Sequence, residues 1–330
     1  MPTGASMSLC SMAGVIAPVS GGDLPWDNKK QGEYPMPNSG KFTRRGLLAT
    51  AGALAVTSAW GDDTPMFDDS KPTTGIAIPS AQHIQEMDAA PLIEKTVNKL
   101  WNDAPTIKEP NAMQFTPSGT LLILDQVDPN KVFEVTPADG KILRTVQTEA
   151  NHGSGITIGD GGDWWITSTR GPVGEEIPMT MKVDPKTGKT LKKRITPGWG
   201  FYGANGAAPV PPPVSSASGG HDVKWAGHGQ YWMAVPSSGR IFLMDAESGK
   251  IVRSIPTAVN RPHGMAIDGD FLWVVASDFW QIHRLDPKTG KILAKIQLDK
   301  DKDPSIHGLE IRNGVLWYCD ANKGWVCNLT

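Results

Sequence analysis

Four of the seven histidines in the chain stand at the same position of a repeated pattern. Each precedes a short apolar run, and in three of the four cases a glycine follows the histidine directly. Neutral imidazole suits Zn, Fe, Cu and Mn better than Ca. The recurrence therefore predicts one divalent transition metal ion (Fe, Cu, Zn or Mn) held by His152, His221, His263 and His307.

Asn111 holds the corresponding position in the first copy of the pattern. A side-chain amide is a poor ligand for a transition metal, so this side of the ion would stay open to water or substrate, as a catalytic site requires. The alternative is that the histidines are architectural and bond to the backbone of neighbouring copies.

Three carboxylates and one phenol are candidate catalytic groups near the same metal. Asp125, Asp278 and Asp320 follow the second strand of their copies, where they could orient the imidazoles, complete the metal shell or act as a general base. A turn-capping role explains each of them equally well. Tyr202 belongs to an insertion, residues 196–220, whose length and aromatic content favour a lid over the site, with a linker as the alternative.

The elements that must position these residues are short strands. A turn sequence that ends in Gly-Lys recurs at residues 136–141, 184–189, 245–250 and 286–291, in each case after an alternating run. Glycine adopts the positive φ that such tight turns need. A further pair of runs precedes each hairpin. Four strands in about 40 to 45 residues are typical of a β-propeller blade.

The sequence therefore predicts an all-β protein, a β-propeller of five four-stranded blades over residues 110–330. The blades are expected to begin near Asn111, Gly153, Asp222, Gly264 and Gly308. The second strands carry tryptophans that we expect to wedge between neighbouring blades: Trp165, Trp232, Trp273 and Trp317.

The last copy holds only three strands, so its outer strand must come from the segment before residue 110. Residues 60–109 are expected to form a short, partly helical extension that closes the ring. Residues 80–101 also fit a helix, which leaves the closing strand open. Six blades are the alternative if residues 72–108 contain a degenerate blade.

Residues 1–59 read as a leader. Arg44 and Arg45 precede a mildly apolar run that ends at Ala59, a pattern that resembles a twin-arginine (Tat) signal. The run is shorter than the roughly 20 residues of a membrane span. We expect the Tat export machinery as a partner, a periplasmic location and no stable membrane span. The stretch before the arginines is long for such a leader, so a start at Met36 is an alternative.

Charge and cysteine content exclude other classes. The net charge is −2, so the chain lacks the basic surplus of a general nucleic-acid-binding protein. Three cysteines cannot form a disulfide scaffold. Cys319 and Cys327 could pair in an oxidising compartment.

The Leu-Trp-Val run, the Asp-Pro-Lys-Thr-Gly-Lys-Ile turn and the Pro-His-Gly strand start resemble the group of propellers that includes virginiamycin B lyase, SMP-30/gluconolactonase and YVTN-repeat proteins. The likeness covers about residues 110–330. Lyase-like members imply a metal that polarises a lactone ester while a histidine removes a proton, and lactonase-like members imply a metal-bound water. The chain departs from both, because it lacks a close match to the lyase His/Glu set and has histidines where the lactonase has acids. A four-histidine centre is also similar in principle to that of carotenoid-cleaving oxygenases.

The function that these patterns predict is a periplasmic metal-dependent enzyme that acts on a small organic molecule, as a lyase or an ester or lactone hydrolase. One alternative is an Fe- or Cu-dependent oxygenase or oxidase on the same four histidines. The other is a non-catalytic binding propeller whose histidine ring is architectural.

Overall fold

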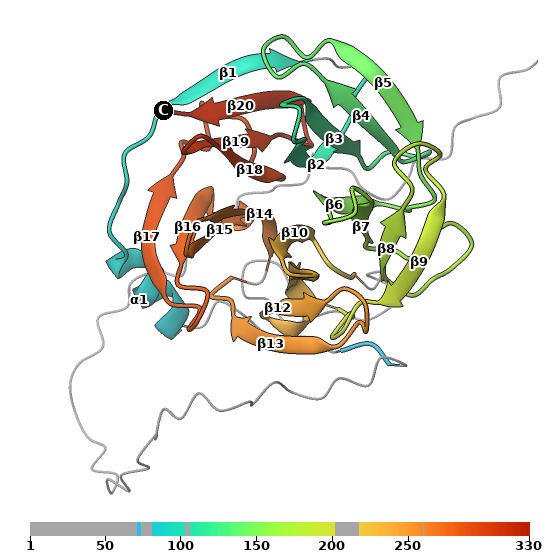
Figure 1. The fold of residues 1–330 in the computed structure, drawn as a ribbon. Coiled ribbons are helices and arrows are strands. Elements are labelled where there is room, and N and C mark those ends of the chain that lie inside the picture. The colour runs from blue at the N-terminus through green and yellow to red at the C-terminus, as the bar shows by residue number, and fades with distance from the viewer. Residues whose placement is uncertain (1–70, 74–80, 103–105, 202–217, 260) are drawn as a thin grey trace, which may run out of the picture. The chain divides into compact units, whose positions relative to one another are not determined.

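The computed structural model describes residues 71–73, 81–102, 106–201, 218–259 and 261–330. Over these residues the chain forms five four-stranded antiparallel sheets arranged around a central axis (Figure 1). The predicted five-bladed propeller is confirmed, and residues 72–108 contain no sixth blade within their described part. The twin-arginine pattern lies outside the described residues.

Each blade is a meander that runs from the axis outward. Blade 1 contains β2 (Pro110–Phe115), β3 (Leu121–Asp125), β4 (Lys131–Val135) and β5 (Ile142–Gln147). Blade 2 contains β6 (Gly153–Ile158), β7 (Trp164–Ser168), β8 (Met179–Val183) and β9 (Thr190–Ile195). Blade 3 contains β10 (Asp222–Gly227), β11 (Gln230–Val235), β12 (Arg240–Asp245) and β13 (Ile251–Pro256). Blade 4 contains β14 (Pro262–Asp268), β15 (Phe271–Ala276), β16 (Gln281–Leu285) and β17 (Ile292–Gln297).

Blade 5 takes its outer strand from the other end of the chain. Its inner strands are β18 (Leu309–Arg312), β19 (Val315–Cys319) and β20 (Trp325–Leu329), and β1 (Val97–Asn102) pairs antiparallel with β20. The segment before residue 110 therefore closes the ring. This pairing covers the backbone groups of β20, which would otherwise form an open sheet edge.

The helical interpretation of residues 80–101 is correct only for its first part. The helix α1 spans Ala81–Ala89, and the chain beyond it runs along the edge of β17, where Ile93 N donates to Lys295 O at 2.7 Å. Pro91 stands between these two segments. The residue before a proline disfavours helical φ/ψ and proline itself lacks an N–H, so the helix ends before it.

The repeated turn sequences form the hairpins between third and fourth strands. In blade 4 the Asp286 carboxylate accepts the Lys288 amide at 2.8 Å, and Gly290, at φ +76°, donates its amide to Asp286 O at 2.8 Å. The turn works because aspartate holds the backbone with its side chain while glycine takes the left-handed conformation without strain.

The second-strand tryptophans fill the space between blades, as predicted. Trp165 of blade 2 packs with Val223, Tyr231 and Met233 of blade 3. Trp273 of blade 4 packs in the same way against blade 5. The apolar core is therefore divided into wedges between neighbouring blades, and the axis is left to polar side chains.

The possible disulfide between Cys319 and Cys327 is absent, because both thiols are free and buried. In the β19–β20 register, Tyr318 lies opposite Cys327 and Cys319 lies opposite Val326. Since side chains alternate across a strand, the two thiols lie on opposite faces of the sheet. They belong to different core wedges and cannot meet.

In the part of the chain that the structure covers, none of the helices combines the length and the hydrophobicity that a bilayer crossing requires.

Candidate functional site

The four repeated histidines gather at one mouth of the central channel, where the innermost strands begin. His263 is the second residue of β14, and the other three lie one or two residues before β6, β10 and β18. His221, His263 and His307 are buried and His152 is half-buried. The rings of His221, His263 and His307 form a stack, with centroids 4.8 Å apart in both neighbouring pairs. We call His152, His221, His263 and His307 the imidazole cluster.

The glycines that follow these histidines allow adjacent blades to approach at this mouth. Gly264 N donates to His307 O at 2.7 Å, and a Cβ on Gly264 would overlap that oxygen and the Leu309 amide nitrogen. A Cβ on Gly308 would lie 2.7 Å from Ala112 Cα in blade 1. The two residues of each His-Gly pair thus have separate roles. The glycine permits close contact between inner strands, and the histidine occupies the mouth of the channel.

The hydrogen bonds of Ser277 determine the tautomer of His263. Ser277 Oγ donates its only proton to Ile306 O at 3.0 Å, so it must accept from His263 Nδ1, which lies 2.6 Å away. His263 therefore carries its proton on Nδ1, and Nε2 presents a lone pair. A protein acceptor on one ring nitrogen and a lone pair on the other is the arrangement in which histidine binds metals or takes up protons.

Burial keeps the imidazole cluster neutral. Burial, with Arg170 and Arg261 nearby, lowers the pKa of His152 to about 3, and burial, Arg261 and His152 lower the pKa of His307 to about 3. Burial first and Arg261 second hold the pKa values of His221 and His263 well below their usual range. At neutral pH the cluster therefore offers uncharged nitrogen donors.

Arg261 is the charged residue that acts on the pKa of all four imidazoles, whereas Arg170 acts on His152. Its Nη1 lies 3.4 Å from Asp278 Oδ1, which compensates part of the charge. A guanidinium beside neutral imidazoles favours an anionic group or a carbonyl oxygen of a ligand.

The neutral nitrogen donors of the imidazole cluster suit a transition metal, but the orientation of the rings does not. The rings of His221 and His263 are only 16° from parallel, so their in-plane lone pairs do not meet at one point. Among the described residues no set of three or more His, Cys, Asp or Glu side chains is arranged to hold a metal ion. The rings would have to turn about their side-chain torsions to share an ion, and the metal stays a prediction.

The predicted carboxylates differ in their surroundings. Asp125 accepts the amides of Lys108, Glu109 and Val127 at 3.0 to 3.2 Å, so it ties the segment before β2 to blade 1. Asp320 accepts the amides of Asn322 and Lys323 in the β19–β20 turn, and burial raises its pKa. These are turn contacts. Asp278, in contrast, contacts the histidine mouth through its ion pair with Arg261.

Tyr202 lies outside the described residues, as does most of the insertion 196–220. The described ends of the insertion are anchored. Trp199 and Phe201 are buried, Ser237 Oγ donates to Gly198 O at 2.6 Å, and Ser218 Oγ lies 2.8 Å from His221 Nε2. The insertion thus reaches the imidazole cluster through Ser218, while its role as a lid stays a prediction.

Ser277 and Arg261 were not among the site residues predicted from the sequence. Ser277 belongs to the short helix η4 (Ser277–Phe279) between β15 and β16 and carries no motif of its own. Arg261 stands two residues before His263, which was the available signal.

His283 lies apart from the cluster and supplies a test of the burial effect. It is buried on β16 and bonds through Nε2 to Gln281 Oε1 at 2.8 Å. Burial, with Lys295 nearby, lowers its pKa to about 4. The unfolded chain then binds more protons than the folded chain between about pH 6.5 and pH 4, so this histidine costs stability as the pH falls through that window.

Both proteins should lose free energy of unfolding when the pH falls from 7 to 4. We expect this loss to be smaller in His283→Gln than in the unchanged protein, by up to about 3 kcal/mol. Urea unfolding at the two pH values measures the difference, and the other histidines cancel because both proteins contain them. Parallel losses in the two proteins would contradict the assigned pKa.

Of the comparisons with known proteins, the one with solved structures supports the fold. No protein-family model matches the chain, and no curated protein matches its sequence. Among solved structures, the glutaminyl cyclase of Myxococcus xanthus matches 72% of this chain and 97% of its own, with 9% identity and a TM-score of 0.51. Virginiamycin B lyase from Staphylococcus aureus matches 69% of this chain and 68% of its own, with 18% identity and a TM-score of 0.40.

The shared feature is the propeller. At these identities the likeness extends to the fold alone, and the chemistry must be argued from the side chains at the axis.

Proposed function

We propose that the protein is an enzyme that acts on a small carbonyl-containing molecule at the imidazole cluster, as a lyase or as an ester or lactone hydrolase. The observation that carries this proposal is the hydrogen-bonded chain from Ile306 O through Ser277 to His263, which leaves His263 Nε2 with a lone pair at the mouth. A purely architectural histidine does not need a ring nitrogen whose lone pair is fixed in this way.

In this proposal the residues of the mouth have separate tasks. Arg261, held by Asp278, binds the carbonyl or carboxylate oxygen of the substrate. His263 accepts a hydrogen bond or a proton at Nε2, and Ser277 keeps the ring in the required tautomer. The depressed pKa of His263 makes it a weak base by itself, but an anionic substrate that compensates Arg261 would raise that pKa again.

The proposed function includes one transition metal ion bound by the imidazole cluster. Nε2 of His263, together with nitrogens of His152, His221 and His307 after ring rotation, would hold one divalent Fe, Cu, Zn or Mn ion. Such an ion supplies Lewis acidity toward a carbonyl oxygen or a water molecule. The charge of Arg261 opposes a further cation, so the compensation by Asp278 is part of the metal site.

Elemental analysis of protein purified after export, combined with activity on a panel of lactones and esters, tests the proposal. We expect close to one transition metal ion per chain and hydrolysis or elimination that a chelator abolishes. Stoichiometric metal with an oxidative turnover would favour the oxygenase alternative. A protein without metal and without turnover on the panel would contradict the proposed enzyme.

A second candidate is a binding propeller for a small organic anion. It is favoured by the nearly parallel rings and by the effect of Arg261 on all four imidazoles, which together suit an anion better than a cation. Binding of a carboxylate without turnover by metal-free protein would distinguish it.

We further propose a periplasmic location reached through the Tat route, which rests on Arg44 and Arg45 and on the apolar run that follows them. Export of the folded protein would allow the metal to be inserted before translocation.

A further inference from the structure

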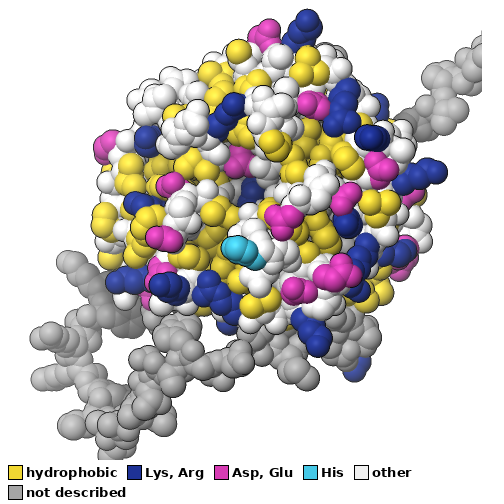
Figure 2. Space-filling view, viewed as in Figure 1, with side chains coloured by type: hydrophobic (Ala, Val, Ile, Leu, Met, Phe, Trp, Pro, Cys, Tyr) yellow, Lys and Arg dark blue, Asp and Glu magenta, His cyan; other side chains and the backbone are white. Residues whose placement is uncertain are grey.

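The opposite mouth of the channel contains a second polar site that the proposed function does not use. A pocket of about 430 Å³ opens there, lined by residues at the far ends of all five inner strands. The face shown in Figure 2 is hollowed near its centre, with acidic and basic side chains visible in the hollow. Pockets where polar groups converge from several elements are the usual ligand sites of such folds.

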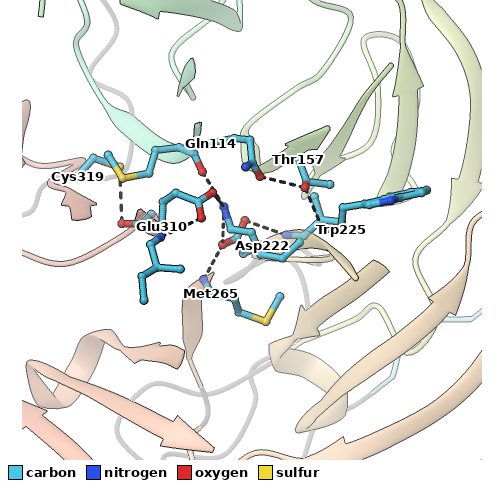
Figure 3. A network of polar contacts seen from close by, with 12 residues as sticks. Gln114, Thr157, Asp222, Trp225, Met265, Glu310 and Cys319 are labelled. Carbon is cyan, nitrogen blue, oxygen red and sulfur yellow. Dashed lines mark hydrogen bonds and ion pairs between the residues drawn. The ribbon is translucent and has the colours of Figure 1, made fainter. Parts of the chain in front are cut away.

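Lys224 lies at the base of this pocket and is only 3% exposed. Its Nζ donates to Met113 O at 2.6 Å and lies 3.4 Å from Glu310 Oε2 and 3.9 Å from Asp222 Oδ2 (Figure 3). Two carboxylates therefore share one ammonium group. Burial raises the pKa of Asp222 to about 7 and also raises the pKa of Glu310, because one ammonium group offsets the burial of two carboxylates only in part.

Glu310 and Lys224 are the members of this set that line the pocket. One oxygen of Glu310 accepts the Ile311 amide at 2.9 Å, and the other is the oxygen near Lys224. Asp222 is fully buried, accepts the amides of Val223 and Met265, and does not line the pocket.

The walls of the pocket suit an organic cation. Phe115 and Trp225 line it on the sides of blades 1 and 3. The Phe115 ring already has the Arg312 guanidinium over it at 4.8 Å, and the Trp225 ring stacks with Trp165. A ligand ammonium group would therefore meet the remaining exposed parts of these rings. Gln114 and Thr157, joined by a 3.0 Å hydrogen bond, add neutral polar groups between them (Figure 3).

The turns around the rim of the pocket contain more acidic than basic residues. The turns between first and second strands on this face carry four aspartates and one arginine: Asp160, Asp163, Asp268, Asp270 and Arg312. Asp163 is paired with Lys182, while Arg312 lies over the Phe115 ring and donates to Gly119 O. The remaining three aspartates outnumber the one arginine in these turns, and Asp160 lines the pocket itself, a distribution that favours cations on this face.

We propose that this pocket is a binding site for a small organic ammonium ion, with Glu310 as its carboxylate partner and with Phe115 and Trp225 as its aromatic walls. The proposal is independent of the imidazole cluster, because the two sites occupy opposite ends of the inner strands.

Calorimetric titration of the full protein with three probes of similar size tests the proposal: 2-phenylethylammonium, neutral 2-phenylethanol and anionic 3-phenylpropionate. We expect the ammonium probe to bind at least about tenfold more tightly than the alcohol, the equivalent of about 1.4 kcal/mol. We expect its affinity to fall between about 20 mM and about 200 mM salt, because the rim charges are screened. Equal affinities, or tightest binding of the carboxylate through Lys224, would overturn the proposal.

Variants locate the binding. Glu310→Gln should lower the affinity for the ammonium probe about tenfold and leave the affinity for the alcohol unchanged. Glu175→Gln is the control, since Glu175 pairs with Lys193 and neither residue belongs to the pocket lining. If Glu310→Gln does not fold, Asp270→Asn on the exposed rim should still reduce the affinity and its salt dependence. Unchanged ammonium binding in both pocket variants would also overturn the assignment.

Discussion

Under the proposed function, replacing His263 by alanine is expected to lower turnover at least about 100-fold and to abolish binding of the proposed metal ion, while the propeller still folds. His263 is the imidazole whose free lone pair is defined by the structure, because Ser277 Oγ accepts its Nδ1 proton. Loss of the ring removes the lone pair at Nε2 and the Nδ1–H group that donates to Ser277 Oγ. Elemental analysis and steady-state rates on the substrate found in the lactone and ester panel measure both effects.

His283→Ala is the matched control, because it removes another buried histidine from the same blade without touching the mouth. It should retain metal and turnover per folded molecule. Ser277→Ala should give an intermediate loss of about 10- to 100-fold, because the ring remains but its tautomer is no longer fixed. Full activity and full metal content in His263→Ala would remove the imidazole cluster from the mechanism.

Replacing Gly264 by alanine is expected to cost about 3 kcal/mol of folding free energy. The added Cβ would overlap the backbone of His307 and Leu309, two neighbours that cannot swing away as a flexible side chain can. The strands β14 and β18 would have to separate at the imidazole cluster. Urea unfolding measures the loss, and a thermal scan should show a matching decrease in Tm.

Gly161→Ala is the control for the general effect of replacing glycine. A Cβ there would meet only the Asp163 side chain at 3.3 Å, in an exposed turn. Its free energy of unfolding should change by no more than about 0.5 kcal/mol. If the two variants were equally stable, the close approach of the inner strands at this mouth would be wrong.

Much of the fold could be predicted because the blade is a local unit. The Asp-Pro-Lys-Thr-Gly-Lys turns fix hairpins within a few residues, and repetition then fixes the number of blades. The wedge role of Trp165 and Trp273 followed from their repeated position on second strands. Residues 80–101 were harder, because their apolar spacing fits a helix, whereas the unpaired edge of β20 decides that β1 is a strand.

For the candidate sites, the sequence alone determined that four histidines occupy equivalent positions and therefore meet at one mouth. Only the tertiary structure decided what surrounds them: the tautomer of His263, the charge of Arg261, and the pairing of Lys224 with Glu310 and Asp222 at the other mouth. The physical reason is the distance along the chain between the residues that interact. Strands and turns follow from interactions between near neighbours in the chain, whereas hydrogen bonds and charges at the axis join residues from different blades, such as Ser277 with Ile306 and Lys224 with Met113.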